Sequence, residues 1–225
     1  MLRELREKFS RLVVKNLCNS LDIQILGLCR NLSKLPELLR ESPRVSIIQG
    51  DSTDLETLQC FSRGCKVVTC CYLGDNDFMT KGQKLLVDAC ELENVSRYIA
   101  RDYCLDFTKL ELGQHPAKDP MKHVKAHLET KKNVKGVHML IGAFMGTFLS
   151  GYFGVWDQEV FKLNYYGTGD ELWESTTYDT AAQHVAAVAN DRNAVGRQYC
   201  ESIFREMTRA TNKLLTITFL SLSPR

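Results

Sequence analysis

The sequence of 225 residues lacks a strong excess of charge of either sign, since 29 Lys and Arg against 27 Asp and Glu leave a net charge of +2. A balance this even gives no electrostatic case for binding nucleic acid or an anionic membrane. The first residues, MLRELREKFSRL, also lack the long apolar core of a secretory signal peptide. We therefore expect a cytoplasmic protein whose partners are neither nucleic acid nor lipid.

Metal-binding patterns are also missing. None of the nine cysteines forms a CxxC pair, and Cys60 and Cys65 make only an isolated CxxxxC. His123 and His127 have the spacing of a two-histidine zinc face, but Val124 stands where the HExxH motif needs its glutamate. We expect reduced thiols and no metal site.

The most apolar stretch, residues 137–156, reads VHMLIGAFMGTFLSGYFGVW. Its length would allow a membrane span, but four glycines, a histidine and two hydroxyl residues interrupt it. The surrounding pattern favours a buried strand followed by a loop, so we expect no membrane segment.

What the sequence does contain is a regular alternation of strand and helix patterns. Apolar residues recur at helical spacing up to about Cys18. Five apolar runs then read as strands, and most are separated by amphipathic helices: IQILGLC, VSIIQGD, KVVTCCYLG, SRYIARDY and VHMLIGAF. This rhythm predicts an α/β fold with a doubly wound parallel sheet, covered by helices on both faces. The first run suits a strand buried on both of its faces.

After Gly151 the rhythm changes. VFKLNYYGTGD alternates like an edge strand, and TYDTAAQHVAAVAND predicts a helix capped by Thr or Asp. ESIFREMTRATNKLL resembles a helix, and the final TITFLSLSPR has no obvious partner. We expect a main domain over residues 1–150 and a small, incomplete region over 151–225.

Polar or small residues follow each predicted strand, which is where a doubly wound sheet binds its ligand. The residues at these ends are Arg30, Lys34, Asp51, Tyr72, Gly74, Tyr103 and 142–145. Sheets that prefer NAD place an acidic residue after the strand that Arg30 follows here. A guanidinium at that place pairs instead with the 2′-phosphate of NADP, although a solvated surface arginine is the alternative interpretation.

Several segments resemble the NmrA-like family of atypical short-chain dehydrogenases, which stands beside isoflavone reductase-like enzymes. They include ILGLCRNLSKL, VSIIQGDSTDLETL, SRYIARDYCLDFTKL, GQHPAKDPMKHVKAHLE and GVHMLIGAFMGTFLS, and the form is similar to fungal members. The likeness spans about residues 8–197. It implies a Rossmann fold that prefers NADP, with a smaller C-terminal substrate region. By this resemblance Arg30, with Lys34 nearby, would face the 2′-phosphate and Asp51 the adenine end, while Tyr72–Gly74 would pass the pyrophosphate or ribose. Phe144 would lie on the nicotinamide side.

The sequence departs from the family pattern at the phosphate-binding turn. Family members open with a strand and a GxxGxxG turn, whereas the first glycine here is Gly27. We therefore expect a Rossmann-like sheet truncated at its N-terminus. Burying the five or six side chains of such a strand is worth on the order of 10 kcal/mol, which rivals the net stability of a domain. Weak NADP binding and marginal stability follow as expectations.

The second departure concerns catalysis. The lysine of isoflavone reductase-like enzymes falls by this resemblance at Met121, so Lys122 supplies the proton only if the helix register tolerates one step. Tyr103 could assist, and no YxxxK pair is present.

Three functions stay open. The first is an NADP-dependent oxidoreductase that transfers hydride to a small, possibly aromatic, secondary metabolite. The second is a non-catalytic NADP sensor that regulates a transcription factor, which would also be nuclear. The third is an inactive fragment.

Overall fold

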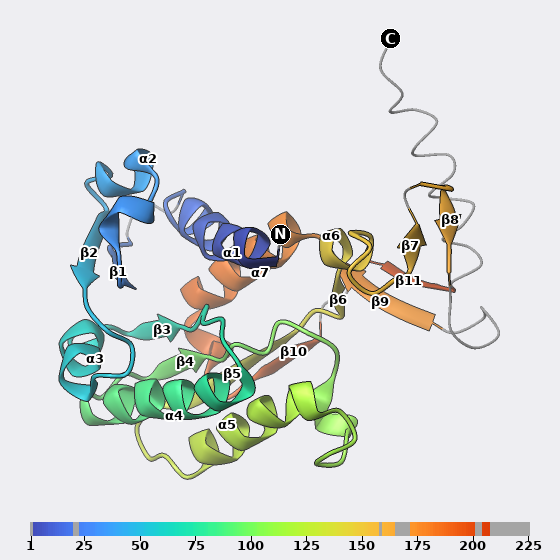
Figure 1. The fold of residues 1–225 in the computed structure, drawn as a ribbon. Coiled ribbons are helices and arrows are strands. Elements are labelled where there is room, and N and C mark those ends of the chain that lie inside the picture. Colours follow the sequence, from blue (N-terminus) through green and yellow to red (C-terminus); the bar gives the residue numbers. More distant parts are fainter. Residues whose placement is uncertain (1, 20–22, 158, 165–171, 201–203, 208–225) are drawn as a thin grey trace.

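The computed structural model describes residues 2–19, 23–157, 159–164, 172–200 and 204–207, and Figure 1 draws the remainder as a thin trace. The helices of four or more residues are α1 (Leu2–Leu17), α2 (Glu37–Arg40), α3 (Leu55–Ser62), α4 (Asn76–Leu92), α5 (Asp119–Glu129), α6 (Met145–Phe148) and α7 (Tyr178–Asn190). Short 3₁₀ helices are η1 (Leu32–Lys34), η2 (Phe107–Lys109), η3 (Pro116–Lys118) and η4 (Arg192–Ala194). The strands are β1 (Ile25–Cys29), β2 (Val45–Gln49), β3 (Val67–Thr69), β4 (Arg97–Ile99), β5 (Lys135–Leu140), β6 (Ala143–Phe144), β7 (Trp156–Asp157), β8 (Lys162–Leu163), β9 (Leu172–Thr176), β10 (Gln198–Cys200) and β11 (Phe204–Met207).

The predicted parallel α/β architecture is confirmed. β3, β4, β5 and β10 form a four-stranded parallel sheet in the order β10-β5-β4-β3, and β1 pairs with β2 in a separate parallel sheet. Figure 1 shows the β1–β2 pair set apart from the larger sheet. β6, β9 and β11 make a third, mixed sheet, and β7 pairs with β8 in the outlying part of the molecule.

Helices cover both faces of the four-stranded sheet, as the sequence predicted (Figure 1). One face packs against α3, α4 and α5 through a core that includes Leu58, Leu86 and Tyr98. The opposite face packs against α1 and α7 through a core that includes Phe9 and Val137. Successive strand residues point to opposite faces, so the core residues of one strand divide between the two layers.

Residues beyond 150 contribute to the main body. β10 pairs with β5, and α7 packs along α1 with Ala181 and Val185 fully buried. Thr177 caps α7, in agreement with the predicted hydroxyl cap. The division into regions 1–150 and 151–225 stays a prediction.

Two expectations about individual elements are wrong. β1 was expected to be buried on both faces, yet all five of its residues are only partly buried, because β2 is its one neighbouring strand in the part of the chain that the structure describes. The helix expected over residues 201–215 is replaced at Phe204–Met207 by β11, which pairs antiparallel with β9. Pairing with a strand distant in sequence overrides the local helical spacing there.

Other elements differ from the sequence prediction mainly in their boundaries. α4 begins at Asn76 rather than near Lys81, because the Asp75 side chain caps its first turn. Of the predicted edge strand VFKLNYYGTGD, residues 160–164 lie within the described part of the chain, and Lys162–Leu163 form β8 there. TITFLSLSPR lies outside them. Within the described part of the chain, no helix is long and apolar enough to cross a membrane.

The turn between α5 and β5 is held by a single carboxylate. Glu91, near the end of α4, accepts the backbone N–H groups of Lys132 at 3.0 Å and of Asn133 and Val134 at 2.9 Å. Desolvation would raise the pKa of Glu91, but these three donors and the charge of Lys131 leave that pKa below its usual range. Glu91 therefore ties α4 to the start of β5.

We predict that Glu91→Gln lowers the free energy of unfolding by about 1–3 kcal/mol, because charged hydrogen bonds to backbone donors are lost. Above the pKa of an unfolded glutamate, about 4.3, the loss should be complete, and it should vanish as pH falls through the lower folded pKa. Urea unfolding from pH 3 to pH 8 measures it. Glu129→Gln, which breaks only the exposed pair with Lys125, should cost less than about 0.5 kcal/mol. Equal losses in both variants would contradict this role for Glu91.

Candidate functional site

A small pocket opens where β3, β4 and β5 end. Seven residues line it, and together they are called the aromatic pocket below: Phe9, Cys71, Tyr72, Arg101, Tyr103, Phe144 and Tyr178. They come from α1, from the segments that follow β3 and β4, from β6 and from α7. Three of the predicted site residues, Tyr72, Tyr103 and Phe144, therefore lie together, at the edge of the sheet where ligands bind in folds of this kind.

Four aromatic rings form the wall on the α1 and α7 side. Phe144 stacks on Tyr178 with ring centroids 4.0 Å apart and planes 5° apart. Phe9 meets Tyr103 at 4.7 Å and Phe144 at 5.2 Å, both edge to face. The free volume between the side chains is about 10 Å³, roughly the room for one water. A planar ligand needs more room than this, so it would have to displace side chains of the pocket.

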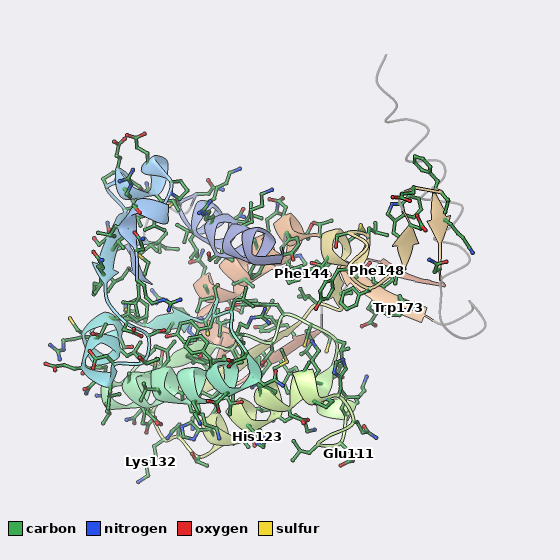
Figure 2. The ribbon with its side chains drawn as sticks, viewed as in Figure 1. Glu111, His123, Lys132, Phe144, Phe148 and Trp173 are labelled. Atoms are coloured by element: carbon green, nitrogen blue, oxygen red, sulfur yellow. The ribbon has the colours of Figure 1, made fainter. Side chains whose placement is uncertain are left out.

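Phe144 also marks the border with the outlying part of the molecule. Figure 2 shows Phe144, Phe148 and Trp173 following one another from the main body outward. The Phe148 and Trp173 rings lie 4.8 Å apart, and Trp173 is 42% exposed. Apolar surface thus continues from the aromatic pocket toward β9.

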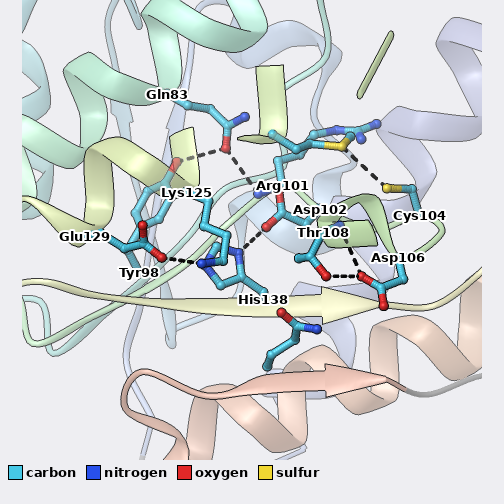
Figure 3. A network of polar contacts seen from close by, with 12 residues as sticks. Gln83, Tyr98, Arg101, Asp102, Cys104, Asp106, Thr108, Lys125, Glu129 and His138 are labelled. Atoms are coloured by element: carbon cyan, nitrogen blue, oxygen red, sulfur yellow. Dashed lines mark hydrogen bonds and ion pairs between the residues drawn. The ribbon is translucent and has the colours of Figure 1, made fainter. Parts of the chain in front are cut away.

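Arg101 supplies the charge of the aromatic pocket. Its Nε donates to the carbonyl of Tyr72 at 2.8 Å, and its backbone N–H donates to Oε1 of the fully buried Gln83 at 3.1 Å. The same Oε1 accepts the hydroxyl of Tyr98 at 3.2 Å (Figure 3). The carboxamide of Gln83 therefore fixes the chain at the point where Arg101 enters the pocket.

The acidic groups of the pocket are held in their neutral forms. Burial raises the pKa of Tyr103 well above its usual value, and its hydroxyl donates to the carbonyl of Cys70 at 3.2 Å. Desolvation likewise raises the pKa of Cys71 to about 12 and that of Cys70 to about 11, although the charge of Arg101 opposes it. At neutral pH these groups are neutral, and Tyr103 is a poor proton donor.

Tyr72 and Gly74 lie in the segment between β3 and α4. Ser52 faces the buried Tyr72 hydroxyl but falls outside hydrogen-bond geometry, so this hydroxyl has no partner among the described residues. The ring of Tyr72 lies 5.2 Å from that of Phe78. Any side chain at Gly74 would meet the Phe78 ring, since a Cβ there would lie 2.5 Å from Cδ1. Close packing alone therefore requires glycine at this position.

Arg30 and Asp51 lie at the neighbouring ends of β1 and β2. Cys29 and Gln49 are paired in the sheet, and Gln49 donates to the carbonyl of Arg30 at 3.2 Å. Both Arg30 and Asp51 are exposed. Hydrogen bonds from Thr53, helped by the charge of Arg30, hold the pKa of Asp51 below its usual range. Arg30 makes no ion pair within the described part of the chain; the side chain of Lys34 lies outside it.

Lys122 lies apart from the aromatic pocket. Its ammonium donates to the carbonyl of Leu110. The neighbouring Met121, where the resemblance placed the lysine, is buried with its sulfur 3.4 Å from that of Cys104. The structure therefore does not bring Lys122 and Tyr103 together, and a role for Lys122 in proton transfer stays a prediction.

A buried pair of polar side chains lies beneath the same strand ends. Asp102 follows Arg101 and contacts Nδ1 of His138, in β5 (Figure 3). Asp102 is fully buried and His138 is 7% exposed. The pair points toward α5, on the opposite face from Phe9 and Tyr178, so it joins β4 to β5 from below.

The sequence did not single out Phe9, Arg101 or Tyr178. Phe9 has the apolar spacing of an ordinary core residue, and Tyr178 begins a helix far along the chain. Arg101 did carry a signal, because it is a charged residue directly after an apolar strand. That signal is the same one that singled out Arg30.

The fold and the pocket together define a Rossmann-like dinucleotide-binding protein. Residues 8–135 match a family described as NAD(P)H-binding, and the chain belongs to this family. Among curated proteins, no sequence match is found.

Solved structures with the same fold include isoflavone reductase-like proteins, as the sequence resemblance implied. The triphenylmethane reductase of Citrobacter sp., complexed with NADP(H), has a TM-score of 0.73 at 16% identity, and the match covers 97% of this chain and 73% of that one. The Escherichia coli NADPH-dependent quinone oxidoreductase, complexed with NADPH, has a TM-score of 0.75 at 16% identity, covering 96% of this chain and 73% of that one. An isoflavone reductase has a TM-score of 0.71 at 17% identity, covering 93% and 71%.

The residues of this chain fit NAD(P)H at two places, the end of β1 and the aromatic pocket. Arg30 offers an exposed cation at the end of β1, where a ribose phosphate would be bound. Tyr72 offers a buried hydroxyl without a partner among the described residues, and the aromatic pocket offers flat apolar walls. The 225 residues contain no GxxGxxG turn.

Proposed function

We propose that this protein is an NADP-dependent oxidoreductase that reduces small, electron-poor aromatic compounds of the quinone type in the aromatic pocket. The observation that carries the proposal is the meeting of four aromatic rings and one guanidinium at the carboxyl ends of parallel strands in a chain of the NAD(P)H-binding family. The names of two solved structures of this fold, a triphenylmethane reductase and a quinone oxidoreductase, state ring compounds as their substrates.

Bound NADPH supplies a hydride. The pocket residues would orient the acceptor, because Phe144 and Tyr178 already stack face to face and an aromatic acceptor can replace one such contact with another. The same rings exclude water from the reacting carbon. Phe144 would lie on the nicotinamide side, and Tyr72 would lie between it and Arg30, which would bind the 2′-phosphate with Lys34 and Asp51 nearby.

A quinone suits a pocket without a good acid. Reduction of a quinone adds one hydride and one proton, and the negative charge that forms is spread over the ring and its oxygens. The proton therefore comes from solvent after hydride transfer. A secondary metabolite with an isolated carbonyl would need a positioned acid instead, for which Tyr103 and Lys122 are the candidates.

The first test measures oxidation of NADPH by the 225-residue chain with a quinone acceptor, followed as the loss of NADPH absorbance. We predict turnover with NADPH in preference to NADH. Arg30→Ala should weaken NADPH binding by about tenfold or more and leave NADH binding unchanged, since a charge-assisted bond to the 2′-phosphate is lost. Arg40→Ala, which removes an exposed cation from α2, is the matched control. An equal effect of Arg30→Ala on both nucleotides would reject the assigned phosphate contact.

The second test concerns the proton. We predict that Tyr103→Phe and Lys122→Ala each lower the rate of quinone reduction by less than about tenfold, because the proposed reaction takes its proton from solvent. Loss of a true general acid would lower the rate by roughly 10²–10⁴. Stopped-flow rates between pH 6 and pH 9 check this. A loss of 100-fold or more, with disappearance of any fall in rate toward high pH, would identify the altered residue as the proton donor.

A second candidate function is a redox sensor that binds NADP(H) and regulates a transcription factor without turnover. The raised pKa values of Tyr103 and Cys71 favour it, because neither group is a good proton donor at neutral pH. Nucleotide binding with no NADPH oxidation, over a panel of quinones, would select this function. Such a protein would act in the nucleus as well as the cytoplasm.

A further inference from the structure

We infer that Arg101 is the specificity residue of the aromatic pocket and that the ligand it selects is a planar aromatic compound carrying a carboxylate or a comparable oxyanion. This inference names the substrate class of the proposed oxidoreductase and to that extent rests on it. The fold places the positive charge of Arg101 among aromatic rings, and no carboxylate of the described residues pairs with it.

The guanidinium of Arg101 has donors to spare. Arginine carries five N–H donors, and among the described residues the side chain of Arg101 uses only Nε, toward the carbonyl of Tyr72. No carboxylate of the described residues lies within ion-pair distance of it. The nearest acid in sequence, Asp102, is taken up by His138 on the opposite face of the sheet.

The position of Arg101 is fixed from two sides. Gln83 accepts its backbone N–H, and Tyr72 accepts its Nε, so both the chain and the start of the guanidinium are held in place. Gln83 is itself anchored, because its Nε2 donates to the carbonyl of Met79 at 3.0 Å. A guanidinium that is already oriented loses less conformational freedom when it binds an oxyanion.

The neighbours of Arg101 cannot supply the negative charge. Cys70, Cys71 and Tyr103 feel its charge, which favours their ionised forms, yet desolvation keeps the pKa of each above its usual value. A partly buried cation without an anionic partner is stabilised by an anion that arrives with the ligand. A fork of N–H donors beside flat rings fits a carboxylate on an aromatic ring.

The same charge acts against cationic ligands. A positively charged dye in this pocket would meet an uncompensated guanidinium, and like charges repel strongly in a site shielded from water. Arg101 therefore separates anionic quinones from cationic aromatics of similar size and shape.

The experiment compares two ligands that differ in one group, anthraquinone-2-carboxylate and 2-(hydroxymethyl)anthraquinone, by isothermal titration calorimetry on the full chain. The wild type should bind the carboxylate about tenfold more tightly, the equivalent of about 1.4 kcal/mol. Arg101→Gln should bring the two affinities together, and Arg101→Lys should keep part of the preference because it keeps the charge. Lys132→Gln, which removes an exposed cation after α5 (labelled in Figure 2), should leave the preference unchanged.

Two results would overturn the inference. One is a preference for the carboxylate that survives in Arg101→Gln with the fold intact by circular dichroism. The other is the absence of any preference in the wild type, together with a tenfold weaker binding of NADPH in Arg101→Gln, which would assign Arg101 to a phosphate of the nucleotide. If the preference depends on Arg101 but no NADPH oxidation occurs, the proposed function fails while the oxyanion site stands.

Discussion

The parallel pairing of β3, β4 and β5 is the constraint on which the site depends. In a parallel sheet the carboxyl ends of neighbouring strands meet at one edge, so the segments after Thr69, Ile99 and Leu140 emerge together. Polar bonds then fix the segment after β4 from below: Gln83 binds the backbone at Arg101, and Asp102 binds His138. Buried hydrogen bonds of this kind favour one arrangement of the segment. Register in the sheet therefore determines which side chains enter the aromatic pocket.

The sequence predicted the class of fold because hydrophobic period is a local property. The helices around Phe9, Leu58 and Val124 and the strands around Val68 and Tyr98 all bury the face that their spacing indicated. The prediction from sequence failed where pairing with a distant segment determines the secondary structure. Phe204–Met207 has helical spacing, yet β9 recruits it as a strand. β1 has the composition of a buried strand, yet among the described strands it pairs with β2 on one side alone.

The site was predicted in part for the same reason. Tyr72, Tyr103 and Phe144 were found because each follows a strand, and topology alone brings strand ends together. Phe9 lies in α1 and Tyr178 in α7, which are far apart in the sequence. Only tertiary packing places their rings against Phe144. Lys122 shows the opposite limit: one residue along a helix turns a side chain by about 100°, and its ammonium contacts Leu110 instead of entering the pocket.

Desolvation and charge act in opposite directions on the chemistry of the pocket. Burial raises the pKa values of Tyr103 and Cys71, so their ionised forms are disfavoured at neutral pH and a nucleophilic thiolate is absent from Cys71. A guanidinium carries its positive charge at neutral pH. Arg101 is therefore the charged group that such a pocket can retain beside its rings. An apolar site that keeps one cation and suppresses its anions is suited to a ligand that brings the anion itself.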